Sequence, residues 1–399
     1  MSRALTCTIA PAIDVVSAED WRRLFPDLLD SLDMIRLVQD CGVPGFAFHS
    51  IVVRQGDRPV LLLPLFETTY RLSTLVDADA QRLVEAVTRH LGRRGSLRLL
   101  GVGFVEGEWG QVGIDPVADR VTLDAAWDLA LSALEELAQG LGTDVTAFVN
   151  FTAESGRMLP LGKLNGFCQI HGLPFAQNRI SYTDTHAYIA SLSKKMRSNL
   201  RQKLRKAQGV EVLRTRQPGP WLDAVYQWYL DAYWRSDVQF SVHSREYFKL
   251  ICQRAADAEY VLYFIGERLV AFQLQVVRPD RLICKYFGMD PDVGRTYSLY
   301  FVSWVKDIEY CIAHRIPLYY AGPTEEETKA RFGVQFLSSC ILFKHRYPLY
   351  QGLLATLAKY LAYRPAVSTP PVRLGSDWEE ARVPAQATYA VPAYRAEHV

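Results

Sequence analysis

A strongly basic segment in the middle of the chain limits what this sequence can fold into. Residues 193–207 read SKKMRSNLRQKLRKA and form the densest run of cations in the chain. Apolar residues recur there every three or four positions, which predicts an amphipathic helix with one buried side. Ser193 is a good N-cap for this helix, and Gly209 ends it. The apolar stripe consists of Met196, Leu200, Leu204 and Ala207.

The opposite side of this helix carries cations at the same spacing, and the run contains no acidic residue that could pair with them. Like charges four positions apart on a helix repel one another. Charge runs are often only solvated surfaces. A face that repels itself is better explained by an anionic partner, such as the phosphates of a ligand. We therefore predict phosphate contacts from Lys194, Arg197, Arg201 and Arg205.

Length and composition set broad bounds. A chain of 399 residues is long for a single core, so two to three domains are expected. The 45 basic and 43 acidic residues nearly cancel, so only local clustering of charge is informative. The seven scattered cysteines include no Cys-x-x-Cys pair, and the eight histidines show no metal-ligand spacing, so we expect no metal site.

The same features predict a location in the cytoplasm. Scattered cysteines in odd number suit reduced thiols. The N-terminal apolar run is too short for a signal peptide, and no stretch approaches the roughly 20 apolar residues of a membrane span. We therefore expect no membrane-spanning segment, and nothing in the sequence indicates DNA as a partner.

Alternating helix and strand patterns fill the first half of the chain. Strands are expected at 5–16, 45–54, 60–67, 96–102 and 144–151. Helices are expected to open at residue 17 and to cover 31–39, 77–91 and 123–141. A glycine-rich loop region lies at 103–121.

The second half shows a similar coarse order after a connecting segment at 151–180. Strands are expected at 209–215, 259–265, 269–278, 281–289, 317–321 and 338–346. Besides the basic helix, helices are expected at 184–192, 220–234, 244–257, 296–314, 325–330 and 351–363. The tail from residue 364 is rich in Pro and Ala without periodicity, which indicates an extended segment. We predict domains at 1–175 and 176–363 and a tail at 364–399.

Three motifs in the second half carry a resemblance to a known family. They are the basic segment 192–207, the hairpin YFIGERLVAFQL at 263–274, and the segment AGPTEEETKARFG at 321–333. Their order and spacing resemble the FemABX-like branch of the GNAT N-acyltransferase superfamily, in particular its CelD-like members. The first half fits more loosely, so that the resemblance covers about residues 10–350.

The resemblance implies a fold class and an activity. The expected fold is α/β (α+β), with two tandem GNAT-like domains that each hold a mixed, mostly antiparallel sheet flanked by helices. The expected reaction moves an acyl or aminoacyl group to an amine. Donors in this branch are aminoacyl-tRNA or acyl-CoA, used as co-substrates, and no tightly bound cofactor is expected. The segment that should hold the CoA pyrophosphate departs from the usual pattern, since it reads DPDVGRTYSL at 290–299 and keeps a single glycine.

Acyl transfer to an amine needs a group that stabilises the oxyanion and a base that removes a proton from the amine. The resemblance places the branch's transition-state lysine at Lys329, which on sequence alone reads equally well as a surface lysine. Asp290 and Tyr286 are expected to lie where a GNAT-like sheet opens for the donor, and they are further catalytic candidates, although Tyr286 suits the core equally well. Arg331 is expected either to hold phosphate or to cap its helix, and Tyr297 and Tyr300 either to line the acyl or acceptor pocket or simply to pack. Glu325, Glu326 and Glu327 are candidates for the general base, but carboxylates also stabilise a helix N-terminus, and that structural role is the favoured one.

The sequence supports two functional hypotheses. In the first, the protein is an N-acyltransferase whose acceptor, an amine on a small molecule or a peptide, enters a cleft lined partly by the loop 103–113. Aminoacyl-tRNA is slightly favoured as the donor over acyl-CoA, because the basic side exceeds what a pyrophosphate needs. In the second, a GNAT-like module without chemistry binds RNA or another polyanion. Replacing Lys329 distinguishes the two.

Overall fold

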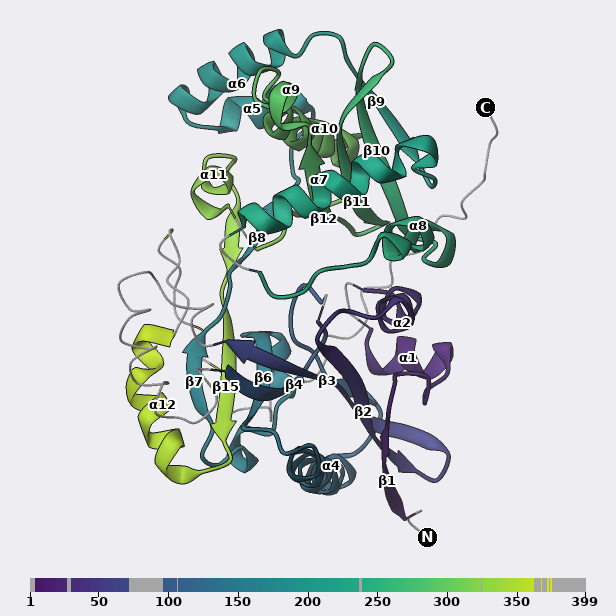
Figure 1. Ribbon diagram of the computed structural model, residues 1–399, viewed down its shortest axis with the longest axis vertical. Coiled ribbons are helices and arrows are strands. Elements are labelled where there is room, and N and C mark those ends of the chain that lie inside the picture. The colour runs from purple at the N-terminus through teal and green to yellow at the C-terminus, as the bar shows by residue number, and fades with distance from the viewer. Residues whose placement is uncertain are drawn as a thin grey trace.

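The computed structural model describes residues 4–26, 30–71, 96–105, 107–236, 239–323, 325–361, 367, 372 and 374. Two β-sheets lie one above the other along the long axis, each flanked by helices (Figure 1). The predicted mixed α/β fold is thereby confirmed. The expected helix at 77–91 and most of the tail at 364–399 lie outside the described residues. In the described part, no helix is long and apolar enough to cross a membrane.

The first sheet is formed mainly by the N-terminal half of the chain. Its strands, in spatial order, are β1 (Leu5–Ala10), β2 (Phe46–Gln55), β3 (Arg58–Arg71), β4 (Ser96–Val102), β6 (Val145–Thr152), β15 (Ser339–His345) and β7 (Cys168–His171), and β5 (Gly113–Ile114) pairs with β3. Helix α4 (Arg120–Leu141) packs on β1, β2 and β3. Helix α1 (Ala18–Leu24) contacts β3 and β5, and α12 (Pro348–Leu361) packs on β7 and β15.

The second sheet is formed mainly by the C-terminal half. Its order is β14 (Gln335–Leu337), β8 (Phe175–Arg179), β13 (Leu318–Tyr320), β12 (Arg281–Met289), β11 (Arg268–Arg278), β10 (Ala258–Ile265) and β9 (Val210–Thr215). Its helices are α5 (Thr185–Ser191), α6 (Lys194–Lys206), α7 (Leu222–Arg235), α8 (Arg245–Arg254), α9 (Pro291–Gly294), α10 (Leu299–His314) and α11 (Glu326–Ala330). Helices α5, α6 and α10 pack together, while α7 and α8 pack together and lie toward the first half (Figure 1).

The two sheets are duplicates in strand order. The series β1-β2-β3-β4-β6-β15-β7 corresponds to β9-β10-β11-β12-β13-β8-β14. In each series the fourth and fifth strands form a parallel pair, β4 with β6 and β12 with β13. The other neighbours along both series are antiparallel. The two halves therefore repeat one unit.

In each sheet, the strand at the sixth position is out of chain order. The predicted domain ranges did not include this arrangement. Strand β8 precedes the second unit's own elements but occupies that unit's sixth position, and β15 returns from the C-terminal half to the sixth position of the first sheet. Residues 339–361, which we placed in the second domain, thus belong with the first sheet. The alternating pattern of this segment predicts a strand but carries no information about its partner. The connecting segment 151–180 likewise contains β7 and β8, which we did not predict.

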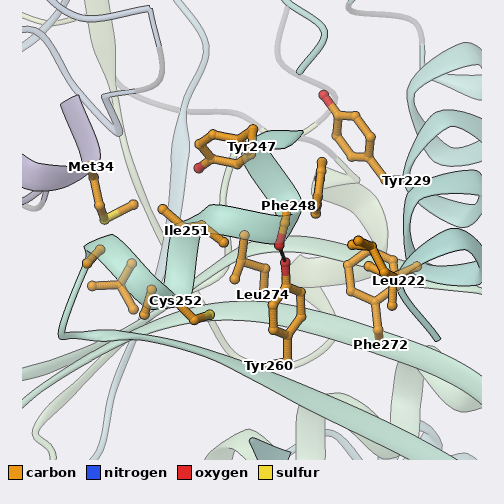
Figure 2. Close-up of a cluster of buried hydrophobic side chains, with 14 of the residues drawn as sticks. Met34, Leu222, Tyr229, Tyr247, Phe248, Ile251, Cys252, Tyr260, Phe272 and Leu274 are labelled. Atoms are coloured by element: carbon orange, nitrogen blue, oxygen red, sulfur yellow. Dashed lines mark hydrogen bonds between the residues drawn. The ribbon is translucent and has the colours of Figure 1, made fainter. Parts of the chain in front are cut away.

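A shared hydrophobic core joins the two halves. Helix α2 (Leu32–Cys41) of the first half packs on α8. Met34 reaches toward Ile251 and Cys252 of that helix (Figure 2). The same cluster contains Phe248, whose carbonyl accepts a hydrogen bond from the buried Tyr260 hydroxyl. Because the cluster is contiguous across the two halves, their relative placement is fixed by packing.

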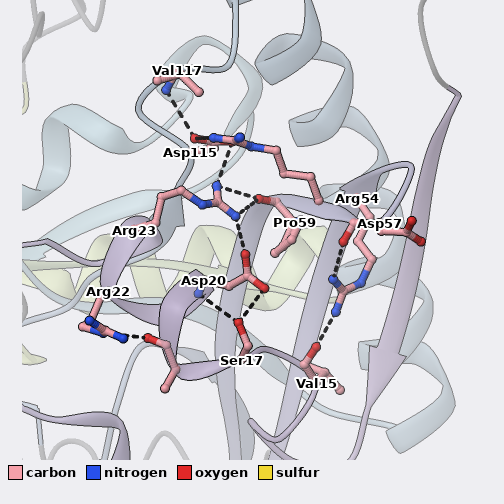
Figure 3. Close-up of polar contacts among 12 residues, drawn as sticks. Val15, Ser17, Asp20, Arg22, Arg23, Arg54, Asp57, Pro59, Asp115 and Val117 are labelled. Carbon is pink, nitrogen blue, oxygen red and sulfur yellow. Dashed lines mark hydrogen bonds and ion pairs between the residues drawn. The ribbon is translucent and has the colours of Figure 1, made fainter.

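A polar cluster fixes α1 against the β2–β3 hairpin (Figure 3). Ser17 caps α1 by accepting a hydrogen bond from the Asp20 amide at 3.0 Å. Arg23 lies 2.8 Å from Asp115, and Arg58 donates to the same carboxylate at 2.9 Å. Burial alone would raise the pKa of Asp115, but the two guanidinium groups and the Val117 amide outweigh it and hold the pKa below its usual value. This buried carboxylate is saturated with donors, so its role is structural.

The basic helix forms as predicted. Ser193 accepts a hydrogen bond from the Met196 amide at 3.2 Å, which confirms the N-cap. Met196, Leu200 and Ala207 are buried, and Leu204 packs at the edge of the same cluster. The helix ends at Lys206, and Gly209 follows with a φ of 94°.

Candidate active site between the two sheets

The second sheet opens at strand β12. Its parallel neighbour β13 pairs with it at two positions, Leu282 with Tyr319 and Ile283 with Tyr320, and then ends, while β12 continues to Met289. On the other side, the register with β11 shifts between Gln275, opposite Cys284, and Leu274, opposite Tyr286. Lys285 is thus the extra residue of a β-bulge. Bulges redirect a side chain and often occur next to active sites.

The glycine-rich loop of the first half closes over this opening. The Gly110 amide donates to the Asn150 carbonyl of β6 at 2.8 Å. A Cβ at Gly110 would lie 2.0 Å from the Val149 carbonyl oxygen, so no side chain fits there. Because Gly110 fixes the loop, Trp109 packs edge-on against Tyr320 of β13 at 5.5 Å, and Glu108 faces β12. The expectation that loop 103–113 lines the cleft is confirmed, since Phe104, Val105, Gly107 and Glu108 line the cavity described below.

A buried cluster of charges forms where loop and bulge meet. The Lys285 Nζ lies 2.7 Å from Asp30 Oδ1 and 3.2 Å from Glu108 Oε1. The Lys285 side chain is 3% exposed, so both ion pairs are removed from water. Burial raises the pKa of Glu108, and the Asp30 charge adds to the rise, while the charges of Lys285 and Lys329 oppose it. A buried carboxyl with a raised pKa beside a cavity is the typical form of a general base.

Lys329 lies behind this cluster. Its side chain is buried, and its Nζ donates to the Gly322 carbonyl at 3.0 Å. Burial lowers its pKa to about 8, against the opposing influence of Cys284, Glu108, Glu325 and Glu326. Lys329 is not among the residues that line the cavity, whereas Pro323, which follows Gly322 in the chain, is. The role of Lys329 at the reacting carbonyl stays a prediction, and Lys285 is the lysine that lines the cavity.

A large apolar cavity extends from the charged cluster between the two halves. It has a volume of about 490 Å³. Its walls come from both units, with side chains of β4, β6, β7 and β15 on one side and of α7 and β12 on the other. Within the described residues, Glu108 and Lys285 are the lining side chains of the Asp, Glu, Lys and Arg types. The cavity thus has one charged position in an otherwise largely apolar lining.

The basic helix lies against the N-terminus of α10, the helix that follows β12 and α9. The Lys203 Nζ lies 3.3 Å from Ser298 Oγ, at the N-cap of α10, and 4.0 Å from the Phe301 ring centroid. Ser298 has a left-handed conformation, and no side chain caps the helix amides. Burial, with Lys206 nearby, lowers the pKa of Lys203. An open helix N-terminus beside a lysine suits an anion.

The predicted cationic row is only partly available. Lys194, Arg201 and Arg205 are exposed, and among the described residues no carboxylate forms an ion pair with them. Arg197 is different, because its Nη1 donates to the Ala190 and Leu192 carbonyls at 2.9 and 2.8 Å. Arg197 therefore caps the end of α5. Lys203, which sequence reasoning did not single out, contacts Ser298 and Phe301 at the N-terminus of α10.

The other predicted site residues are dispersed. Asp290 accepts hydrogen bonds from the Asp292 and Val293 amides and pairs with Arg268 at 2.7 Å. Burial acts against these contacts, yet they hold its pKa below the usual value, which makes it a helix cap and a poor base. Tyr286 does line the cavity and packs edge-on against Tyr229 at 5.0 Å.

Tyr297 and Tyr300 pack in hydrophobic clusters and are not among the residues that line the cavity. Tyr300 touches the cavity wall indirectly, since its ring lies 5.5 Å from that of Phe287. Arg331 is exposed at the C-cap of α11. Within the described residues, no three His, Cys, Asp or Glu side chains gather as metal ligands would.

Sequence reasoning missed the residues that the fold brings together. Asp30 and Glu108 are far from Lys285 in the chain and from each other. The only signal was indirect: a carboxylate inside a glycine-rich loop, and a lysine inside an otherwise apolar strand. Either pattern alone would also suit a surface position.

A comparison with known protein families finds a match in the second unit. Residues 194–330 match the acetyltransferase (GNAT) domain family. The boundaries of this match enclose α6, the bulged strand β12 with Lys285, and α11 with Lys329.

Solved structures extend the GNAT fold to both units. The crystal structure of FemX superposes with a TM-score of 0.52 at 12% identity and covers 85% of this chain and 98% of its own. A tandem GNAT protein of the clavulanic acid biosynthesis pathway gives 0.50 at 13% identity, with 86% and 99% covered. A C-terminal domain assigned to a lysylphosphatidylglycerol synthetase of Agrobacterium fabrum gives 0.51 at 13% identity, with 87% and 98% covered. No curated protein matches in sequence. The two sheets are thus tandem GNAT-like domains, and the resemblance to the FemABX-like branch is confirmed in the fold.

Proposed function

We propose that this protein is an N-acyltransferase that moves an acyl or aminoacyl group from a phosphate-bearing donor to an amine of a small molecule or a peptide. The observation that carries the proposal is the ion-paired cluster at the β12 bulge. Lys285 and Glu108 meet there at 3.2 Å, at the wall of a cavity between two GNAT-like units. A cation and a base of raised pKa are the two groups that amine acylation requires.

The reaction assigns each group a role. The amine nitrogen attacks the donor carbonyl and forms the new C–N bond, while Glu108 accepts a proton from that nitrogen. The Lys285 ammonium opposes the negative charge that develops on the carbonyl oxygen. When the tetrahedral intermediate collapses, the bond to the carrier breaks, and the carrier's sulfur or oxygen leaves with the electron pair and takes the proton from Glu108. Lys329 acts through Glu108, because its buried charge favours the ionised carboxylate.

The donor's phosphates bind at the N-terminus of α10. Lys203 reaches the N-cap Ser298 there, and the helix amides are open. Arg201, Arg205 and Lys194 continue the positive surface along α6, and exposed Arg331 is an additional candidate. A CoA pyrophosphate needs only the first part of this surface, whereas aminoacyl-tRNA would use all of it. Both donors are made in the cytoplasm, where we place the reaction.

A donor screen tests the proposal. Purified protein is heated with acetyl-CoA, longer acyl-CoA esters, charged tRNA and uncharged tRNA, and the unfolding temperature is measured. A true donor raises it by binding the folded state. The stabilising donor is then incubated with an amine library, and acylated products are identified by mass spectrometry. Transfer that Glu108→Gln abolishes supports the proposal. Equal stabilisation by charged and uncharged tRNA without any product would instead indicate the RNA-binding module.

A further inference from the structure

The inter-sheet cavity is much larger than the chemistry at its charged end requires. We infer that the group transferred is a long, unbranched fatty acyl chain, and that this chain lies in the cavity with its carbonyl at Lys285 and Glu108. The inference rests on the proposed function and names its substrate class. It is drawn from the shape and lining of the cavity.

One face of the first sheet supplies the evidence for a missing apolar partner. Leu99, Val149 and Ile341 lie on three adjacent strands, β4, β6 and β15, and they are only partly buried. All three line the cavity. By contrast, residues of these strands that pack toward α4, such as Leu100 and Phe148, are fully buried. Val145, Ala147 and Phe343 of the same face are buried, so only part of the face is exposed. The exposed apolar part costs free energy, and a hydrocarbon ligand would cover it.

The size of the cavity fits a long chain. A cavity of about 150 Å³ in another protein holds one benzene molecule, that is, six carbon atoms. The volume here, about 490 Å³, is roughly three times as large. It therefore has room for on the order of 15 to 20 carbon atoms. An acetyl group would leave nearly all of this space empty.

The position of the phosphate site gives the chain its direction. Strand β12 runs from the bulge at Lys285 through Phe287 to Met289, and α9 leads from there to the N-cap of α10. Lys285, Tyr286 and Phe287 all line the cavity. A donor held by its phosphates at Ser298 would extend along β12 and bring its carbonyl to Lys285. Its acyl chain would then continue between β12 and the first sheet.

Charge argues against an aminoacyl group in the same space. The ammonium of an aminoacyl ester would have to leave water for a lining whose charged side chains, in the part of the chain that the structure describes, are already paired with each other. Burying an unpaired ammonium is strongly unfavourable. A hydrocarbon chain meets no such cost.

The test is a chain-length series with the full-length protein. Acyl-CoA esters from two to eighteen carbons are compared for kcat/KM, together with an aminoacyl-tRNA. We expect kcat/KM to rise about threefold per added methylene over part of the series, and at least about tenfold from acetyl to tetradecanoyl, because each methylene leaves water. A flat series, or a preference for acetyl-CoA or aminoacyl-tRNA, would overturn the inference and leave the proposed function intact. Absence of transfer from every donor would overturn both.

A cavity-filling variant provides an independent measurement. Ala232 of α7 lines the cavity, so Ala232→Trp should lower the preference for tetradecanoyl over acetyl groups by at least about tenfold. Gln227→Trp adds the same ring to an exposed position of the same helix and serves as the matched control. If Ala232→Trp misfolds, binding of a fluorescent long-chain acyl-CoA to the wild-type protein, with tetradecanoyl-CoA and acetyl-CoA as competitors, tests the same point. Equal competition by the two esters would contradict the inference.

Discussion

The two GNAT-like units share a strand order but differ at their parallel strand pair. In the first unit, β4 and β6 pair at four positions, from Leu99 with Val145 to Val102 with Phe148. In the second, β12 and β13 pair at two positions before β13 ends. The register of β3 with β4 is continuous, whereas that of β11 with β12 shifts at Lys285. The first sheet is therefore closed where the second sheet is open.

The helices that connect the two strands of each pair, α4 between β4 and β6 and α10 between β12 and β13, differ in the same sense. The N-terminus of α4 is closed by the Asp119 carboxylate, which accepts a hydrogen bond from the Thr122 amide at 2.8 Å. The N-terminus of α10 has no side-chain cap and carries Lys203 beside it. Helix α4 therefore has a carboxylate of its own at its N-terminus, whereas the N-terminus of α10 is open to an anionic ligand.

This contrast indicates that the two copies of the repeated unit have different roles. The second unit keeps the open sheet and the open helix, which are the features a phosphate-bearing donor needs. The first unit contributes Glu108, Asp30 and one wall of the cavity. Neither unit contains the complete set, so the proposed chemistry depends on their fixed packing.

The largest expected effect comes from removing the carboxylate that the first unit supplies. Glu108→Gln keeps the shape but cannot accept a proton, so kcat should fall about 10²- to 10³-fold, the usual contribution of a general base. Stopped assays of product formation would measure it. Glu135→Gln, at an exposed position of α4, is the control and should match the wild type. Full activity of Glu108→Gln would show that the first unit does not supply the general base.

The second prediction makes the two helix N-termini alike. Ser298→Asp places a carboxylate at the open N-terminus of α10, where a left-handed residue tolerates Asp. It should raise the donor KM by about tenfold or more through repulsion of the phosphates, with little change in unfolding temperature. Asp119→Asn makes the reciprocal change in the first unit and should leave the donor KM unaltered. A similar KM for both variants would show that the phosphates bind elsewhere.

The repeated architecture could be expected from sequence only in outline. The basic helix and the strands expected at 269–278 and 281–289 follow from local periodicity, and they formed as predicted. The exchange of β8 and β15 did not follow, because strand partnership is set by tertiary packing. The same holds for the β12 bulge, whose position depends on β11.

The site was harder to predict than the fold for a physical reason. Residue type and family resemblance pointed to Lys329, which does lie beside the charged cluster but is tied to the Gly322 carbonyl. The pKa of Glu108 is raised by burial, a property of the assembled interface. Asp290 is the opposite case, because its pKa is lowered. Its carboxylate accepts hydrogen bonds from the Asp292 and Val293 amides and caps α9.

A smaller effect is expected at the donor's phosphates. Lys203→Met removes the cation at the α10 N-terminus and should raise the donor KM several-fold while kcat is kept, because only binding is lost. Raising the salt concentration should weaken donor binding less in the variant than in the wild type, since one phosphate contact is missing. Lys195→Met, an exposed position of the same helix, is the control. Identical salt dependence in all three proteins would contradict a phosphate site there.

The smallest effect is expected for Lys329, whose buried charge influences the Lys285, Glu108 and Asp30 cluster without lining the cavity. Its charge favours the ionised form of Glu108, so Lys329→Met should raise the pKa of that carboxyl further. The acidic limb of the pH profile of kcat/KM should then move upward, while activity above the limb stays close to that of the wild type. A collapse of kcat at every pH would instead mean that Lys329 contacts the reacting carbonyl itself.

Lys329 should also change how the free energy of unfolding depends on pH. The direction of this change follows from the pKa of Lys329. In the folded protein that pKa is about 8, below the ordinary value for lysine, so the unfolded chain binds more protons at intermediate alkaline pH. Stability therefore gains a favourable contribution as the pH rises from about 8 toward the ordinary lysine value. Lys329→Met should lack this contribution when chemical denaturation is followed across that range. Retention of the same slope in the variant would show that Lys329 is not the buried group responsible, and the second unit would then owe its pH response to another residue.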